Sequence, residues 1–399
     1  MWPSDDMSEE YKRCKRCVMD TLDPGISFDA DGNCNFCTEY FVREPGQVFK
    51  GNLGQKKLEK FINLIKADGK NKPYDCIMGV SGGVDSTYVA YLAKQQGLRP
   101  LAVHFDNGWN SELAVRNIEN ILNKLNIDLY THVVDWDEFR DLQLSFLKAS
   151  VANAEIPSDH GFLATLYDVA LKHKIKYFLT GTNFETEGIL PAGYGYLSVD
   201  LKHILAVHKR FGTKSLSTYP KLSLPKYMYA RFVRKLTKVS ILNYVNYKKE
   251  AAMELIQKEL GWQYYGGKHY ESIFTRFFQA YILPRKFGFD KRKAHYSSLI
   301  CSGQMTREEA VQLLKTDPCD PKMLVEDREY VIKKLGLTEA SFKEIMNLPT
   351  HLSTDYPNNS RIFAMLTKAN RWLENARSGK RGELTEASKL VNSKIIESK

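Results

Sequence analysis

Six consecutive residues combine small size with hydroxyl and carboxyl groups, in an order that suits phosphate binding. They read Ser81-Gly82-Gly83-Val84-Asp85-Ser86. An apolar run from 74 to 80 precedes them and an amphipathic segment follows, which predicts a strand, a glycine turn and a helix start. Backbone N–H groups in such a turn converge on one point, and the helix N-terminus adds partial positive charge. An anion-binding loop is therefore expected, with an ordinary serine–glycine turn as the alternative.

Four of the seven cysteines form a second group near the start of the chain. They are two C-x-x-C pairs separated by 16 residues: Cys14 with Cys17, and Cys34 with Cys37. This spacing is typical of a zinc ribbon, and four thiolate ligands favour a closed structural site over a catalytic one. A disulfide pair or free thiols are the alternatives. Nucleic-acid binding is a rival role for the ribbon, because basic residues of the 12–16 segment surround the first pair.

Alternating helix and strand patterns follow from about residue 51. Helices are expected at 57–65, 113–125 and 162–171, and strands at 99–105, 129–134 and 176–181. This alternation predicts an α/β fold with a doubly wound parallel sheet, whose ligands bind at the carboxyl ends of the strands. A capping box at 306–309 is expected to open a helix of a helical C-terminal region. The expected domains are a zinc ribbon (1–50), the α/β domain (51–200), and a basic, aromatic substrate region with a helical C-terminal domain (201–399).

Polar groups follow two of the expected strands. His104, Phe105 and Asp106 end one of them and are followed by Asn107-Gly108, although a plain turn also fits this sequence. Gly181 and Thr182 end another and are followed by Glu185 and Glu187. Two carboxylates beside a phosphate loop suit a hard cation such as Mg²⁺, and solvated carboxylates are the alternative.

Charge and hydropathy limit the classes of protein that this chain can represent. Residues 201–249 contain 12 of the 57 Lys and Arg residues and none of the 47 Asp and Glu, interleaved with aromatic residues. That stretch suits a sugar nucleotide, a polynucleotide or a partner protein, or it is a solvated face over an aromatic core. No apolar run approaches the roughly 20 residues of a membrane span. The start of the sequence is acidic where a signal peptide is basic, so a cytoplasmic location is expected.

The six-residue turn resembles the SGGxDS pyrophosphate loop (PP-loop) of the ATP pyrophosphatase superfamily. That resemblance implies cleavage of ATP between its α and β phosphates, with Mg²⁺ on the phosphates and adenylation of a carbonyl or carboxyl oxygen. It also implies the residues that bind the nucleotide: Gly79, Val80, Ser81, Gly82, Gly83, Asp85, Ser86, His104, Phe105, Asp106, Gly181 and Thr182.

Further motifs narrow the resemblance over about residues 11 to 320. The paired C-x-x-C motifs, GTNFETEG at 181–188 and the block from 266 to 310 resemble the N-acetyl sugar amidotransferases of bacterial surface-polysaccharide and flagellin-glycan biosynthesis, the WbpG/PseA type. The implied reaction adenylates the acetamido oxygen of a nucleotide-activated N-acetyl sugar, and ammonia then displaces AMP to leave an acetamidino group. Cations are needed to neutralise the pyrophosphate, and Lys268 with the 291–293 segment is expected to supply them. The expected catalytic residues are Ser81, Asp85, Lys268 and Lys291.

The source of ammonia is expected to be a separate subunit. A built-in glutaminase would need an N-terminal cysteine, and Trp2 follows Met1, while Cys76, Cys301 and Cys319 do not resemble nucleophiles. A glutaminase of the imidazole-glycerol-phosphate-synthase type, or free ammonia, is the expected donor. Two other functions remain as hypotheses: a tRNA-modifying ATP pyrophosphatase whose basic stretch binds RNA, and a non-catalytic zinc-ribbon nucleic-acid binder.

Overall fold

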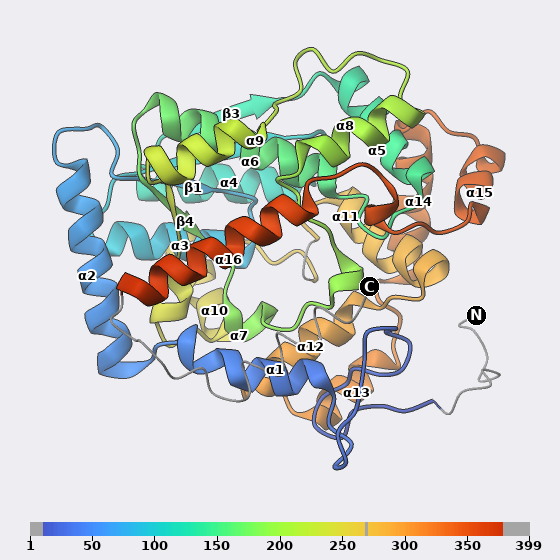
Figure 1. The fold of residues 1–399 in the computed structure, drawn as a ribbon, viewed down its shortest axis with the longest axis horizontal. Coiled ribbons are helices and arrows are strands. Elements are labelled where there is room, and N and C mark those ends of the chain that lie inside the picture. The colour runs from blue at the N-terminus through green and yellow to red at the C-terminus, as the bar shows by residue number, and fades with distance from the viewer. Residues whose placement is uncertain (1–10, 268–269, 378–399) are drawn as a thin grey trace.

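A five-stranded parallel sheet lies at the centre of the protein (Figure 1). The computed structural model describes residues 11–267 and 270–377. The strands are β1 Cys76–Gly79, β2 Pro100–Asp106, β3 Leu129–Val133, β4 Tyr177–Thr180 and β5 Thr237–Ser240. Their order in the sheet is β3-β2-β1-β4-β5, and all neighbouring pairs are parallel. The expected parallel α/β sheet is therefore confirmed.

Helices cover both faces of this sheet and extend to the C-terminal region. The α-helices of the described residues are α1 Asn35–Arg43, α2 Gly51–Gly69, α3 Val84–Gln95, α4 Glu112–Leu125, α5 Trp136–Ala149, α6 Ile156–Lys172, α7 Phe184–Glu187, α8 Leu201–Phe211, α9 Leu224–Met228, α10 Lys249–Leu260, α11 Ile273–Phe277, α12 Lys291–Cys301, α13 Arg307–Leu314, α14 Pro321–Lys334, α15 Glu339–Asn347 and α16 Ser360–Arg377. Short 3-10 turns lie at η1 Glu44–Gly46, η2 Ala192–Tyr194, η4 Ile241–Tyr244 and η6 Ser353–Asp355, and π turns at η3 Tyr229–Val233 and η5 Phe278–Phe287. The three helices expected at 57–65, 113–125 and 162–171 lie within α2, α4 and α6.

The two faces of the sheet have separate cores because successive strand residues point to opposite sides. On one face Met78 of β1 packs with apolar residues of α2, α3, α4 and α10. On the other face its neighbour Ile77 packs mainly with α6. Helix α6 thus covers the sheet with its N-terminal end at the carboxyl edge of the strands, since helices of such units run antiparallel to their strands.

The basic stretch supplies a strand that the sequence patterns did not predict. Residues Thr237–Ser240 form β5, which pairs with β4 from Tyr177 to Thr180. Earlier in the same stretch, between α8 and α9, the loop at 213–219 wraps two carboxylates of α5. Asp141 accepts hydrogen bonds from the backbone N–H groups of Thr213 and Lys214, and Glu138 accepts from those of Ser217 to Tyr219. Two acids of α5 thus hold this loop of the acid-free stretch through its backbone N–H groups.

The C-terminal region is helical, as expected, and has its own core. Phe274, Phe277 and Phe278 pack there against Phe139 and Phe146 of α5. The capping box expected at 306–309 is present at the start of α13, where Thr306 and Glu309 exchange hydrogen bonds. Helices α14 and α15 lie at one side of the molecule, and α16 crosses its front in the view of Figure 1. Residues 378–399 lie outside the described residues.

No helix within the described ranges is both long enough and apolar enough to cross a lipid bilayer.

A buried histidine in α8 makes the stability of the fold depend on pH. His203 is fully buried beside Phe146 and Tyr196, and neither of its ring nitrogens has a hydrogen-bond partner. Burial lowers the pKa of His203 to about 4, although the charge of Asp200 opposes this shift. The unfolded chain therefore binds a proton below pH ~6.5 that the folded chain excludes, and stability falls by about 1.4 kcal/mol per pH unit as the pH drops from there toward 4.

Replacing His203 with phenylalanine should remove this dependence. We expect His203→Phe to unfold at a higher urea concentration than the wild type at pH 5, with a smaller difference at pH 8. His160 provides the control, because its pKa is also lowered to about 4 by burial while its ring bonds the Ser198 carbonyl and the Leu222 N–H. His160→Phe leaves those two groups unpaired and should destabilise the protein at both pH values. A larger loss of stability for His203→Phe than for His160→Phe would contradict this assignment.

Candidate active site

The phosphate loop lies between β1 and α3, as the sequence predicted. Gly82 has a φ of +77°, and a Cβ at this position would lie 2.6 Å from the carbonyl oxygen of Ala114. Ser81 is exposed, and its Oγ lies 3.3 Å from the Oγ of Ser86 and 3.3 Å from the N–H nitrogen of Gly83. Gly83, the N-cap of α3, has no side chain to bond the first N–H groups of the helix. The Tyr265 hydroxyl bonds the backbone of Val84 and lies 3.3 Å from where a Gly83 Cβ would be. This arrangement matches that of a helix N-terminal anion site.

Two aromatic side chains from distant parts of the chain hold the loop in place. The buried Trp262 donates its indole N–H to the carbonyl oxygen of Gly82 at 2.8 Å. The Tyr247 hydroxyl donates to the Asp85 carboxylate. Burial, reinforced by the negative charge of Asp85, raises the pKa of Tyr247, so this phenol stays a hydrogen-bond donor. Sequence patterns gave no signal for either contact, because both partners lie more than 150 residues away.

The end of β4 lies directly against the loop. A Cβ on Gly181 would lie 2.9 Å from the Asp85 backbone carbon, so only glycine permits this approach. Thr182 is exposed, and its Oγ lies 3.0 Å from that of Thr180. Glu185 is nearly fully buried and forms an ion pair with Lys50 at 2.6 Å. The expected Mg²⁺ ligand Glu185 is thus already paired with a lysine.

The end of β2 contributes a buried histidine and a turn. His104 Nδ1 lies 3.0 Å from the carbonyl oxygen of Val80, and its Nε2 lies 3.1 Å from the Asn110 amide nitrogen. A carbonyl only accepts, so Nδ1 carries the proton and Nε2 accepts from Asn110. Phe105 is buried, whereas Asp106 Oδ1 accepts from the Gly108 N–H at 2.9 Å. The polar groups predicted after β2 therefore bond mainly to this turn and to the end of β1.

The block from 266 onward approaches the loop from the other side. The Ser111 N–H donates to the carbonyl oxygen of Glu271 at 2.9 Å, and a Cβ on Gly83 would lie 3.6 Å from a Glu271 carboxylate oxygen. Lys291 lies 3.6 Å from the Glu155 carboxylate at the start of α6. Its two neighbours are engaged elsewhere: Arg292 pairs with Asp290 and Lys293 with Asp20. Lys268 lies outside the described residues.

The four cysteines of the paired motifs come together, with all four sulfur atoms within 4.8 Å of one another. The Cys14 and Cys37 sulfurs are 3.8 Å apart, and those of Cys17 and Cys34 are 3.5 Å apart. Tetrahedral coordination with Zn–S bonds of about 2.3 Å places sulfurs roughly 3.8 Å apart. A disulfide requires about 2.05 Å. The residues therefore fit a four-thiolate zinc site.

The ribbon is packed against two elements of the candidate site. Arg307 donates to the carbonyl oxygens of Cys14 and Cys17 at 3.1 and 3.2 Å. The Tyr40 ring lies 4.7 Å from that of Phe184 in α7. Helix α12 contributes Ser297, whose Oγ accepts from the Val18 N–H at 3.2 Å. Figure 1 shows α1, α7, α12 and α13 gathered at one end of the molecule.

The other three cysteines do not resemble nucleophiles in their surroundings. Burial raises the pKa of Cys76 in β1, and burial also raises the pKa of Cys301 to about 12. Cys319 is buried as well, and its pKa is raised. A reactive cysteine needs a lowered pKa.

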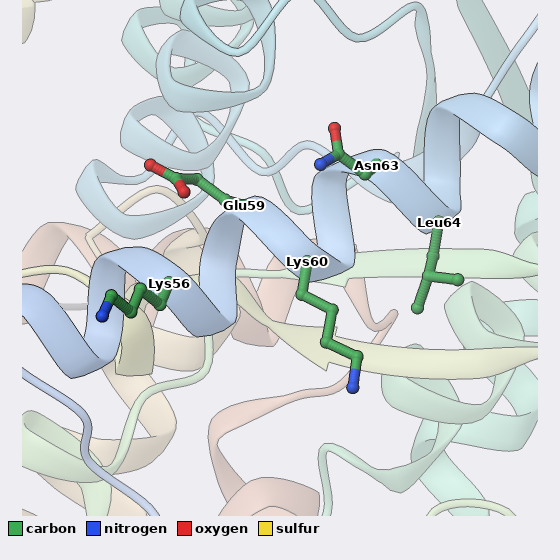
Figure 2. A pocket seen from close by; sticks show the side chains of 5 residues that line it. All are labelled: Lys56, Glu59, Lys60, Asn63 and Leu64. Atoms are coloured by element: carbon green, nitrogen blue, oxygen red, sulfur yellow. The ribbon is translucent and has the colours of Figure 1, made fainter.

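A hollow of about 470 Å³ lies on the outer surface of α2, away from these groups. Figure 2 shows that its five lining side chains all come from this one helix: Lys56, Glu59, Lys60, Asn63 and Leu64. Because it has no convergent groups from other elements, it lacks the features of a catalytic site.

Three solved structures are similar in fold to parts of this chain. The NH3-dependent NAD synthetase from Campylobacter jejuni subsp. jejuni NCTC 11168, in complex with the nitrate ion, is 16% identical over 71% of this chain and 97% of its own, with a TM-score of 0.31. A predicted subunit of tRNA methyltransferase from Methanocaldococcus jannaschii is 13% identical over 45% of this chain and 74% of its own, with a TM-score of 0.27. NMN synthetase from Francisella tularensis is 15% identical over 54% of this chain and 98% of its own, with a TM-score of 0.28.

Two family models match separate parts of the sequence, and no curated protein matches it. Residues 75–163 match the queuosine biosynthesis protein QueC, a stretch that contains the phosphate loop. Residues 271–370 match the C-terminal domain of LPS biosynthesis protein WbpG-like proteins. The match over residues 75–163 indicates an ATP-using enzyme of the PP-loop class. The chain thus joins a PP-loop ATP pyrophosphatase domain to a WbpG-like C-terminal domain, which confirms the resemblance that its motifs indicated.

Proposed function

We propose that this chain is an AMP-forming amidotransferase that acts on a nucleotide-activated N-acetyl sugar. ATP adenylates the oxygen of the acetamido group, pyrophosphate leaves, and ammonia replaces AMP to give an acetamidino sugar. The observation that carries this proposal is the position of the WbpG-like region beside the phosphate loop. Its first residue, Glu271, approaches Gly83, and Lys291 reaches the start of α6. A surface-polysaccharide role, such as O-antigen or flagellin-glycan synthesis, is proposed from the same match.

The chemistry requires positioning and charge stabilisation rather than covalent catalysis. An amide oxygen is a poor leaving group until it becomes an ester of AMP, and negative charge develops on the leaving pyrophosphate. Donors at Ser81, Gly82 and Gly83 are fixed before the reaction, so they can stabilise that charge without reorganisation. The hydrogen bonds from Trp262 and Tyr247 keep the loop in this conformation.

Two metals are part of the proposal. Mg²⁺ would neutralise charge on the phosphates, and Asp85 is the proposed ligand because its carboxylate lies in the first turn of α3. Zinc would be held by the four cysteines and would act structurally.

Ammonia is proposed to come from a separate glutaminase subunit of the imidazole-glycerol-phosphate-synthase type. The buried, high-pKa thiols of Cys76 and Cys301 support this proposal, because glutamine hydrolysis by cysteine requires an activated thiolate. Ammonium should therefore support the reaction of the purified chain and glutamine should not. Turnover with glutamine and the purified chain alone would contradict the need for a partner.

Pyrophosphate release tests the function. ATP, Mg²⁺ and ammonium should be combined with UDP-linked or CMP-linked N-acetyl sugars in turn, and one sugar is expected to stimulate release and to yield a product 1 Da lighter, because NH replaces O. Deacetylated sugars are the matched controls and should give no stimulation. Release that responds to tRNA and to none of the sugars would overturn the proposal and favour the tRNA-modifying alternative.

A further inference from the structure

Contacts among seven segments run around the carboxyl edge of the sheet. The β4 end meets the phosphate loop at Gly181, and α7 meets α12 where His295 Nδ1 lies 2.9 Å from the Thr186 carbonyl oxygen. Helix α12 meets α6 through Lys291 and Glu155. These contacts form one half of a ring around the candidate site.

The other half returns from α6 to the phosphate loop. The Asn107 amide, just after β2, donates to the Ser158 hydroxyl of α6 at 2.9 Å. The turn that follows pairs Asn110 with Ser272, and Glu271 then approaches Gly83. The ring therefore has the phosphate loop on one side and the start of α6 on another.

Asp159 lies in the first turn of α6, one turn before a residue that packs on the end of β1. Residues three apart share a helix face, and Phe162, three residues after Asp159, reaches 2.3 Å from where a Cβ of Gly79 would lie. Asp159 is one turn nearer the N-terminus of α6 than Phe162. That turn of the helix therefore lies beyond the end of β1, on the side of the phosphate loop. Glu155 lies a further turn along the same face.

Asp159 is accessible to solvent but is surrounded by protein groups. Its side chain is exposed, yet desolvation raises its pKa to about 7, with a further rise from Glu155 and an opposing effect from Lys291. Tyr219 is the third titratable group near it, and its hydroxyl donates to the Pro157 carbonyl oxygen at 2.7 Å. Asp159 is therefore open to solvent while charged and aromatic groups of α6, α12 and the 213–219 loop lie near it.

The proposed reaction needs a base at this position. As the amide oxygen bonds to the α-phosphorus and the bond to pyrophosphate breaks, the N–H electron pair forms a C=N bond and the proton must leave. Ammonia then adds to this carbon, the C–O bond to AMP breaks, and the product amidinium is positively charged. We propose that Asp159 accepts the amide proton during adenylation, and that Asp159 and Glu155 together bind the amidinium product. The proton on Asp159 then passes to solvent.

This inference rests on the proposed function, and its test separates the two. Asp159→Asn is compared with Asp168→Asn, a variant at the other end of the same helix that loses only an ion pair with Lys226. Sugar-dependent pyrophosphate release is measured from pH 5.5 to 9 with saturating ATP, sugar and ammonium, and ATP affinity is measured separately. If the wild type shows no sugar-dependent release, the proposed function fails.

If the wild type is active, we expect Asp159→Asn to lower kcat by at least about 100-fold with ATP affinity unchanged. The rise in wild-type rate through pH ~7 should disappear in this variant, while Asp168→Asn should keep both rate and profile. Asp159→Glu should recover part of the rate. An Asp159→Asn enzyme with a kcat within about threefold of the wild type, or with the same pH profile, would overturn the inference alone.

Discussion

Gly82→Ala will reduce ATP-dependent pyrophosphate release by at least about 100-fold, since the loop donors act together on one developing charge. Two physical effects add at this position. The φ of +77° is unfavourable for alanine, and the new methyl group would lie 2.6 Å from the Ala114 carbonyl oxygen. Backbone oxygen cannot move as a flexible side chain does, so the loop itself must shift. The displaced N–H groups would then no longer point at the phosphates.

Gly97→Ala is the matched control for this variant. Gly97 also has a left-handed φ of +68°, but the nearest atom to its Cβ position is the flexible end of Lys66 at 3.4 Å. Gly97 follows the C-terminal end of α3, away from the phosphate loop. The Gly97→Ala variant should therefore lose roughly 1–2 kcal/mol of stability and keep its turnover. The comparison uses steady-state pyrophosphate release and thermal unfolding of both variants. Equal loss of activity in the two would show that general strain, and not the loop geometry, explains the effect.

We expect Cys17→Ser to lose zinc and to inactivate the enzyme. The effect should act through the fold and not through a contact with the substrate. A ribbon of this size depends on its metal for on the order of 10 kcal/mol of folding free energy. Its unfolding would expose the apolar cluster that Tyr40 shares with Phe184 of α7 and Ala294 of α12. Those two helices carry Glu187 and Lys291, so their positions affect the candidate site.

Metal content by mass spectrometry and hydrogen exchange of α7 and α12 measure this effect. Cys301→Ala is the control, because Cys301 lies beside the cluster but is not one of the four sulfurs within 4.8 Å. We expect it to keep the zinc and the slow exchange of both helices. Complete loss of zinc in Cys17→Ser with unchanged exchange and unchanged turnover would contradict a bracing role for the ribbon.

The motifs whose residues are neighbours in the sequence were predicted correctly in their structure. The strand, glycine turn and helix around Ser81 need only local backbone preferences, and the paired C-x-x-C motifs bring thiolates together through two short turns. The capping box at Thr306 is similarly local. Each of these features depends on interactions within a few residues, so sequence alone contains the information.

Contacts between distant segments could not be obtained in this way. The strand β5 was missed because its four residues have a weak pattern and become a strand only by pairing with β4. Of the three cations expected near pyrophosphate at 291–293, Arg292 and Lys293 pair with buried acids instead. The acid pair Glu155 and Asp159 had one sequence signal, acidic residues around a proline at a helix start. Nothing local shows which part of the site these two residues lie beside.

The sequence by itself determined which chemistry is available: a phosphate loop from small residues at a strand–helix junction, and a thiolate site from paired cysteines. Tertiary structure alone decided which groups surround that loop. Trp262 and Tyr247 reach it because a parallel sheet brings the ends of separate strands to one edge, and long connections fold back over that edge. The physical reason is that side-chain type is a local property, whereas desolvation and distance depend on the packing of the whole chain.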